Sequence, residues 1–204
     1  MKNIPTDVIN HLAGITAGSR LDALRDERPE AKVNAQLGFT ALFAPETPGS
    51  VTQTERFALA VFTALLHNAP DIAAFYAQGL TDAGASEALT TAVTETAKDN
   101  ATTGPYGAYP PGPLSAEDET GPAYTPNASR DQTLGPRLAA AFSHTFMLVF
   151  HPRDAKSAHL QNLLDAGWTT DGIVTISQLV TFLAYQIRLV HGLKAMQSGG
   201  AAHG

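Results

Sequence analysis

Residues 52–80 read TQTERFALAVFTALLHNAPDIAAFYAQGL. Thr52 and Glu55 have the spacing of a capping box, in which each side chain bonds an exposed backbone amide at the start of a helix. Apolar residues then fill most sides of the segment from Phe57 to Leu66, which predicts a helix near the centre of the molecule. Pro70 predicts the start of a second helix, because proline suits the first helical position. The stretch therefore predicts two successive helices and indicates an all-α fold.

The helical pattern continues on both sides of this stretch. Few segments alternate polar and apolar residues as a half-buried strand does. Pro5–Asp7 and Pro29 predict helix starts, and Gly167 is typical of the glycine that follows a helix end. The segments expected to be helical are 8–15, 29–43, 52–66, 70–80, 86–98, 138–149, 154–166 and 172–196. We expect a single domain over residues 1–204, with a flexible tail at 197–204.

Residues 102–136 have a different character. They are rich in proline and glycine, carry the acidic cluster Glu117–Glu119, and show no apolar periodicity. This composition predicts a long inserted loop. Tyr106, Tyr109 and Tyr124 could anchor the loop to the body of the protein, so we expect a lid over the mouth of the candidate site. The alternative is a surface insertion that contacts nothing.

The composition excludes several classes of function. The chain contains no cysteine, which excludes CxxC redox centres, thiolate nucleophiles and zinc–thiolate sites. The net charge is −6 and lysine and arginine form no unmixed cluster, so no nucleic-acid partner is expected. The first residues do not resemble a signal peptide, and no apolar run approaches the roughly 18 residues of a membrane span. We therefore expect a cytoplasmic protein without membrane contact.

The histidines do not have the spacing of a metal site. His144 and His151 are seven residues apart, which places them about 10 Å apart along a helix. That separation is too large for one ion, and His159 lies beyond a proline. We expect no metal and no cofactor.

A short internal repeat is visible in two places. Gln78–Gly84 (QGLTDAG) matches Gln161–Gly167 (QNLLDAG) at five of seven positions, and a polar residue and an apolar helical pattern follow each copy. One explanation is that a helix-turn-helix unit has been duplicated. The other is that Leu-x-Asp-Ala-Gly is simply a common helix stop.

The C-terminal part of the chain resembles a known family. Residues 137–193 read RLAAAFSHTFMLVFHPRDAKSAHLQNLLDAGWTTDGIVTISQLVTFLAYQIRLVHGL, with Ala166–Trp168, Arg188 and Gly192–Leu193 at characteristic positions. This stretch resembles the double-length alkylhydroperoxidase D-like proteins of the carboxymuconolactone decarboxylase superfamily. Residues 28–43 and 52–68 are similar to the first two core helices of that family. The resemblance covers about 29–100 and 135–195, and it implies an all-α bundle that assembles as a homo-oligomer, as a trimer, hexamer or dimer.

The same resemblance shows what this chain lacks. The peroxidase branch uses a glutamate, a CxxC pair and a histidine. These positions correspond to Phe57, Ala69, Ile72 and Tyr76 or, with the register moved by one residue, to Ala58, Pro70, Ala73 and Ala77. None of the four catalytic residues is present, so thiol-based peroxidase chemistry is excluded. The decarboxylase branch does not need the cysteines but uses a histidine where this chain has Tyr76. A tyrosine can donate a proton, although its ordinary pKa is about 10.

The candidate catalytic residues are Tyr76, His67 and Arg188. His67 ends an apolar helix, where it could either meet the helix dipole or act as an acid or base in a pocket. Arg188 lies on a mostly apolar helix, where an unpaired guanidinium is costly. It could pair with Glu55 or a loop acid, or bind a ligand carboxylate. Glu55 itself is either half of the capping box or a pocket carboxylate. Tyr185 and Trp168 are expected in the core.

Two functional hypotheses follow. The first is a non-peroxidase binding or partner subunit in an oligomer, with a cysteine-containing relative as one candidate partner. The second is a cysteine-independent, decarboxylase-like acid/base enzyme acting on a small, largely apolar acid. An enzyme requires polar groups that converge on a cavity, whereas a binding subunit would have the family's catalytic positions packed and dry.

Overall fold

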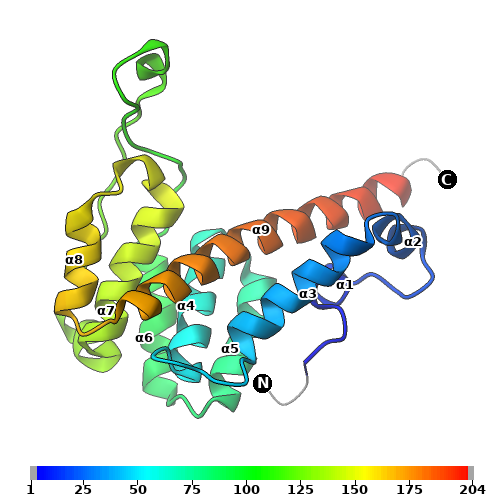
Figure 1. The fold of residues 1–204 in the computed structure, drawn as a ribbon, viewed down its shortest axis with the longest axis horizontal. Coiled ribbons are helices and arrows are strands. Elements are labelled where there is room, and N and C mark those ends of the chain that lie inside the picture. Colours follow the sequence, from blue (N-terminus) through cyan, green and yellow to red (C-terminus); the bar gives the residue numbers. More distant parts are fainter. Residues whose placement is uncertain (1–3, 202–204) are drawn as a thin grey trace.

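The structure is a computed structural model that describes residues 4–201, and within that range it is helical with no strand, which confirms the all-α prediction. Figure 1 shows the helices packed into one bundle, with one long loop projecting from it. The helices are α1 (Val8–Ala13), α2 (Arg20–Asp26), α3 (Pro29–Phe43), α4 (Gln53–Leu66), α5 (Pro70–Asp82), α6 (Glu87–Asp99), α7 (Ala128–Phe150), α8 (Ser157–Asp165) and α9 (Thr170–Ala201), with the 3₁₀ turns η1 (Pro113–Glu117) and η2 (Pro152–Asp154).

Helix α4 is the central element. Its N-terminus has the predicted capping box, because the Thr52 hydroxyl accepts from the Glu55 amide and the Glu55 carboxylate accepts from the Thr52 amide. Every residue from Phe57 to Ala64 is buried. The helix packs against α5, α6, α7 and α9, and Phe62 stacks on Phe142 of α7 with ring centroids 4.1 Å apart. Because it has apolar residues on all sides, α4 can serve as the core onto which the other helices pack.

Helix α9 is longer than the sequence pattern indicated. It reaches Ala201 and so includes the first part of the predicted tail, and residues 202–204 lie outside the described range. Within Thr170–Gly199 the most apolar window of 18 residues has a mean hydropathy of 1.5, so by length and composition this helix could cross a membrane, which corrects the expectation that no segment meets those criteria. One face of α9, including Leu179, Leu183 and Ile187, is buried in the same core as α4. That packing is the behaviour of a core helix in a bundle.

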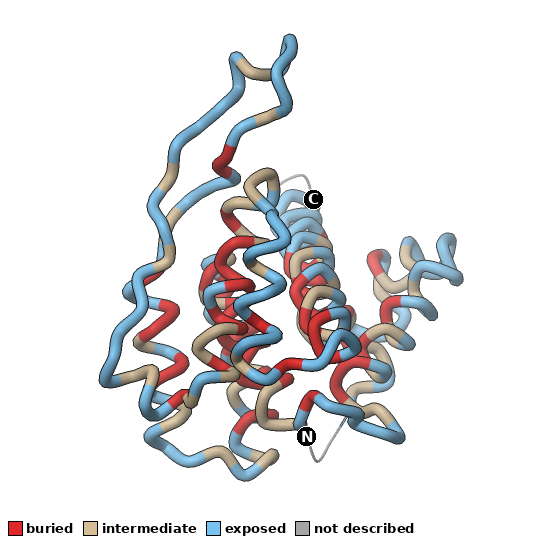
Figure 2. The backbone as a smooth tube through the Cα atoms, turned by 60° about the vertical axis from the view of Figure 1, so that its left-hand side comes forward, coloured by how far each residue is buried: buried red, intermediate tan, exposed pale blue. Residues whose placement is uncertain are grey.

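The predicted insertion ends earlier than expected. Asn127 caps α7 by accepting a hydrogen bond from the Arg130 amide at 3.1 Å, so α7 begins well before Pro136. The helix bends at Gly135, whose φ of 75° interrupts the helical geometry. The segment without α-helix is therefore 101–127, here called the projecting loop. Figure 2 shows that most of this loop is exposed and stands away from the buried helices.

Only the base of the projecting loop contacts the bundle. The Tyr106 amide donates to the Phe150 carbonyl at 2.6 Å, and the Tyr124 ring lies 5.8 Å from that of Phe146. Tyr109 lies beneath the guanidinium of Arg153 at 4.3 Å. The tyrosines thus anchor the two arms of the loop at the C-terminal end of α7. The expectation of a lid is wrong for the tip of the loop, which projects into solvent (Figure 1).

The repeated heptapeptide forms the same local structure twice. Gly84 and Gly167 follow the ends of α5 and α8 with φ of 85° and 89°, a conformation that glycine adopts without strain. The Gln78 amide donates to Asp82 and the Gln161 amide to Asp165, at 3.1 and 2.8 Å. The repeat is therefore a helix stop in both places. A shared stop motif is sufficient to explain this similarity, and duplication of a larger unit stays a hypothesis.

Candidate functional site

The family positions without catalytic residues lie in the packed core. Phe57, Ala69, Ile72 and Tyr76 are all 0% exposed. The Phe43 ring lies 4.8 Å from that of Tyr76 and 5.4 Å from that of Phe57, so aromatic side chains fill this region. None of the four residues lines either of the cavities described below. Side chains of this chain therefore fill the space around these four residues.

Tyr76 is tied into that core by a hydrogen bond. Its hydroxyl donates to the Oε1 of Gln186 at 2.5 Å, and Gln186 is also 0% exposed. Burial raises the pKa of Tyr76 well above its ordinary value, and the Gln186 bond opposes only part of that effect. The phenol stays protonated and has no access to a ligand. The structure therefore places Tyr76 in the core, apart from the other two candidate residues.

His67 is the C-cap of α4, as its position in the sequence indicated. Its Nε2 is buried without a hydrogen-bond partner. Burial, together with the smaller effect of the positive charges of Arg188 and His191, lowers the pKa of His67 to about 4. The imidazole is consequently neutral at pH 7. His67 lies at the C-terminal end of α4 as expected, but a neutral imidazole interacts with the helix dipole less strongly than a charged one.

Arg188 does not form the expected ion pair. Its guanidinium is exposed and donates only to the Ala184 carbonyl one turn earlier, at 2.9 Å, and it has no acidic partner in the described part of the chain. Glu55 instead pairs with Arg137, whose Nε lies 2.8 Å from the Glu55 Oε1. Arg137 also donates to the Gly167 carbonyl and lies 3.9 Å above the Trp168 ring. This cluster joins the start of α4 to the turn between α8 and α9.

His67 and Arg188 line one cavity of about 580 Å³, here called the His67 groove. Its walls come from the end of α4, the start of the projecting loop, the last turn of α7 and the middle of α9. The other lining residues are Leu66, Asn68, Thr102, Thr103, Gly104, Pro105, Leu148, Val149, Phe150, Pro152, Val180, Thr181 and Ala184. No carboxylate is among them, so the Arg188 charge is uncompensated beside a largely apolar surface. That combination suits a ligand with an apolar body and one anionic group.

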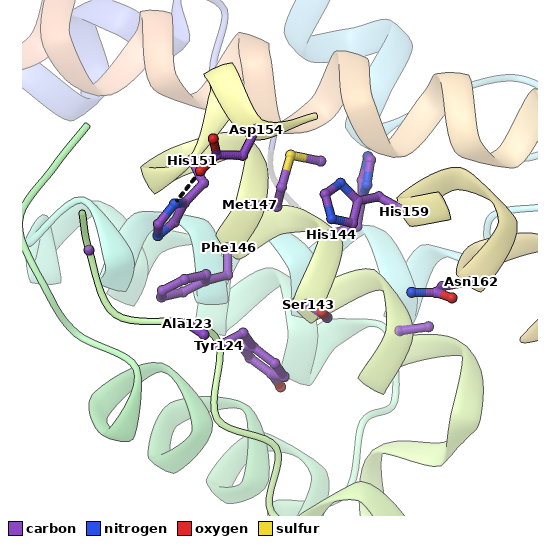
Figure 3. Close-up of a pocket in the computed structure, with 12 residues that line it drawn as sticks. Ala123, Tyr124, Ser143, His144, Phe146, Met147, His151, Asp154, His159 and Asn162 are labelled. Carbon is purple, nitrogen blue, oxygen red and sulfur yellow. Dashed lines mark hydrogen bonds and ion pairs between the residues drawn. The ribbon is translucent and has the colours of Figure 1, made fainter. Parts of the chain in front are cut away.

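A second cavity of about 420 Å³ lies between α7, α8 and the second arm of the projecting loop, and it is called the His144 groove (Figure 3). Its lining includes His144, His151 and His159, which the sequence analysis considered only as metal ligands. No group of three metal-ligating side chains occurs among residues 4–201. No local sequence pattern predicts this groove, because its lining combines residues of α7 with residues of the loop before α7 and of the segment after it.

His151 and Asp154 both line the His144 groove and contact each other. The Nδ1 of His151 lies 2.9 Å from the Asp154 Oδ2, and its Nε2 lies 2.9 Å from the Pro122 carbonyl oxygen. His151 thus contacts an oxygen acceptor through each of its two ring nitrogens. The bond from His151 holds the pKa of Asp154 below its ordinary value. His151 thus joins the second arm of the projecting loop to the turn after α7.

Comparison with known proteins does not extend these observations. No protein-family model, no curated protein and no solved structure matches the chain. Functional inference therefore rests on the geometry of the two grooves, on the packed family positions, and on the resemblance carried by the quoted residues.

Proposed function

We propose that this chain is a cysteine-free, alkylhydroperoxidase D-like protein that works by binding, as a non-peroxidase subunit of a homo-oligomer in the cytoplasm. The observation that carries the proposal is the complete burial of Phe57, Ala69, Ile72 and Tyr76. A binding subunit does not need an open redox site, and filling that site with apolar side chains adds packing energy to the core. A cysteine-containing relative is an alternative assembly partner.

Exposed apolar side chains support assembly. Val33 and Leu37 on α3 are 55% and 59% exposed, and Val174 and Tyr185 on α9 are 55% and 44% exposed. The position of Tyr185 corrects the expectation that it lies in the core. Helices α3 and α9 contact each other where Phe182 lies over Gly38, so these residues belong to adjoining elements. A surface of this kind is typical of contacts between subunits.

The ligand that best fits the His67 groove is a small, largely apolar acid. Arg188 would hold the carboxylate, and the walls from α7 and α9 would contact the apolar part. The second candidate function, a decarboxylase-like acid/base enzyme, is favoured by the presence of an imidazole and a guanidinium in the same groove. An efficient catalyst needs a pKa near the working pH, however. The low pKa of His67 makes it a weak base, which favours binding over catalysis.

Two measurements test this function. Light scattering should give a mass that is a multiple of 21.4 kDa, and a mass of a single chain at micromolar concentration would contradict assembly. Calorimetry should detect binding of cyclohexanecarboxylate but not of cyclohexanemethanol, which has the same apolar body without the charge. Arg188→Gln should weaken carboxylate binding about tenfold or more. Arg20→Gln on the exposed surface of α2 is the matched control. Equal loss in both variants would show a general charge effect instead of a site.

A further inference from the structure

The His144 groove contains a buried polar atom that none of the residues described by the structure satisfies. His144 is 5% exposed and lines the groove, and its Nδ1 has no hydrogen-bond partner. Buried polar atoms in folded proteins nearly always have a partner. An unpartnered ring nitrogen on a side chain that lines a cavity of about 420 Å³ is a candidate contact for a ligand.

The surroundings of His144 determine which kind of atom it presents. Its Nε2 lies 3.3 Å from the hydroxyl oxygen of Ser177 on α9. That hydroxyl donates its single proton to the Ile173 carbonyl at 2.9 Å, so it can only accept from His144. The ring proton therefore sits on Nε2, and Nδ1 carries a lone pair. Burial, followed by the charge of nearby His159, lowers the pKa of His144 to about 4, so the ring is neutral at pH 7.

Other polar groups in the groove complement this acceptor. The Nδ1 of His159 accepts from the Lys156 amide at 3.2 Å, which leaves its Nε2 as a donor. Figure 3 shows His144 and His159 together, with Ser143 and Asn162 nearby. The described chain offers no hydrogen bond to the side chains of Ser143 and Asn162. The rest of the lining is mostly apolar and includes Ala140, Phe146 and Met147.

No lysine or arginine is among the described residues that line the groove. Asp154 is engaged by His151, which also bonds the Pro122 carbonyl. A charged ligand would lose its hydration here without gaining an opposite charge. The groove therefore differs from the His67 groove, whose Arg188 suits an anion.

We propose that the His144 groove binds a small, uncharged and largely apolar molecule that carries a hydroxyl or N–H group, and that this group donates a hydrogen bond to the Nδ1 of His144. A phenol is the simplest molecule of this class. The ring would lie against Met147 and Phe146, and its hydroxyl would satisfy the buried acceptor. The site is separate from the His67 groove and stands whether or not that groove binds acids.

The test compares two probes of nearly the same shape. p-Cresol has the hydroxyl donor, and 4-methylanisole has a methyl group in place of that proton. Calorimetric titration should show p-cresol binding about tenfold or more tightly, because the ether leaves the buried Nδ1 unpaired. In ¹⁵N NMR spectra, p-cresol should shift the Nδ1 resonance of His144, whereas 4-methylanisole should not. Equal affinities, or no p-cresol binding at millimolar concentration, would overturn the proposal.

Three variants locate the site. Ser143→Phe places a bulky side chain on the exposed rim of the groove and should abolish p-cresol binding without disturbing the core. Gln161→Phe adds the same bulk to α8 outside the groove lining and should leave binding unchanged. His144→Phe should remove the preference for p-cresol over 4-methylanisole. If Ser143→Phe binds p-cresol like the unmodified protein, the ligand lies elsewhere and the proposal is wrong.

Discussion

Replacing Tyr76 with phenylalanine tests whether this residue serves the core or a catalytic site. The change keeps the ring packed against Phe43 and removes only the hydroxyl that donates to Gln186. The Nε2 of Gln186 already lacks a partner, so Tyr76→Phe leaves a completely buried amide with no side-chain hydrogen bond. An unsatisfied buried polar group costs about 1–3 kcal/mol. The variant no longer buries a phenol hydroxyl, and this offsets part of the cost of the unsatisfied amide. We therefore expect a loss of about 1–2 kcal/mol in the free energy of unfolding.

The assay is urea unfolding followed by the fluorescence of Trp168, the single tryptophan, which is 2% exposed. A loss of this size corresponds to a fall of about 2–8 °C in Tm for a chain of this length. The matched variant is Tyr76→Phe combined with Gln186→Leu, which replaces both polar partners with apolar groups. We expect the double variant to recover most of the stability, since removing both partners of a buried hydrogen bond can be nearly neutral.

The reasoning fails if Tyr76→Phe has the stability of the unmodified protein, or if the two changes are simply additive. Either result would mean that the hydrogen bond between Tyr76 and Gln186 does not contribute to stability as argued. Binding of cyclohexanecarboxylate should be the same in Tyr76→Phe, because Tyr76 does not line the His67 groove. If Tyr76→Phe lost acid binding or turnover while its stability was unchanged, Tyr76 would have a catalytic or binding role.

Three further predictions follow from the structure. Purified protein should show no peroxide turnover with any dithiol reductant, since the chain contains no cysteine; turnover by metal-free protein in proportion to its concentration would contradict this. The pKa values of His67 and His144 are about 4 in the folded chain, below the unfolded value of 6.5, so the unfolded state binds more protons between these limits. Stability should therefore fall as the pH drops from about 6.5 to about 4, and His144→Leu should reduce the slope in urea unfolding. His151→Phe removes the hydrogen bonds from His151 to the Asp154 carboxylate and to the Pro122 carbonyl. Chymotrypsin should therefore cut the projecting loop at Tyr106 or Tyr124 faster than in the unmodified protein. Equal cleavage rates would show that His151 does not hold the loop.

Much of the local structure could be predicted from the sequence. The capping box of Thr52 and Glu55, the proline starts of α3 and α5, and the glycine stops after α5 and α8 all occur where the pattern placed them. These features depend on neighbours within one helical turn, so a short stretch of sequence contains the interacting atoms. The apolar pattern of α4 predicted its burial, and Trp168 is buried as expected of a large aromatic residue.

The start of α7 was harder to predict, because its first turns lie within the proline- and glycine-rich segment. Asn127 supplies the cap, but Gly135 and Pro136 interrupt the apolar pattern and conceal the helix. The length of α9 was underestimated for a related reason. Its last residues carry no apolar pattern, yet the helix continues to Ala201.

The absence of cysteine and the all-α class were determined by the sequence itself, because composition and helical periodicity do not depend on distant contacts. Only the tertiary structure decided which candidate residues share a site. In the folded chain His67 and Arg188 line the same groove, and Tyr76 lies apart from both in the core. Glu55 forms an ion pair with Arg137. The tertiary structure also placed His144 beside His159 and left one ring nitrogen without a partner. Burial, pKa and hydrogen-bond partners arise from atoms brought together across many residues of chain, and no local pattern records which segments will meet.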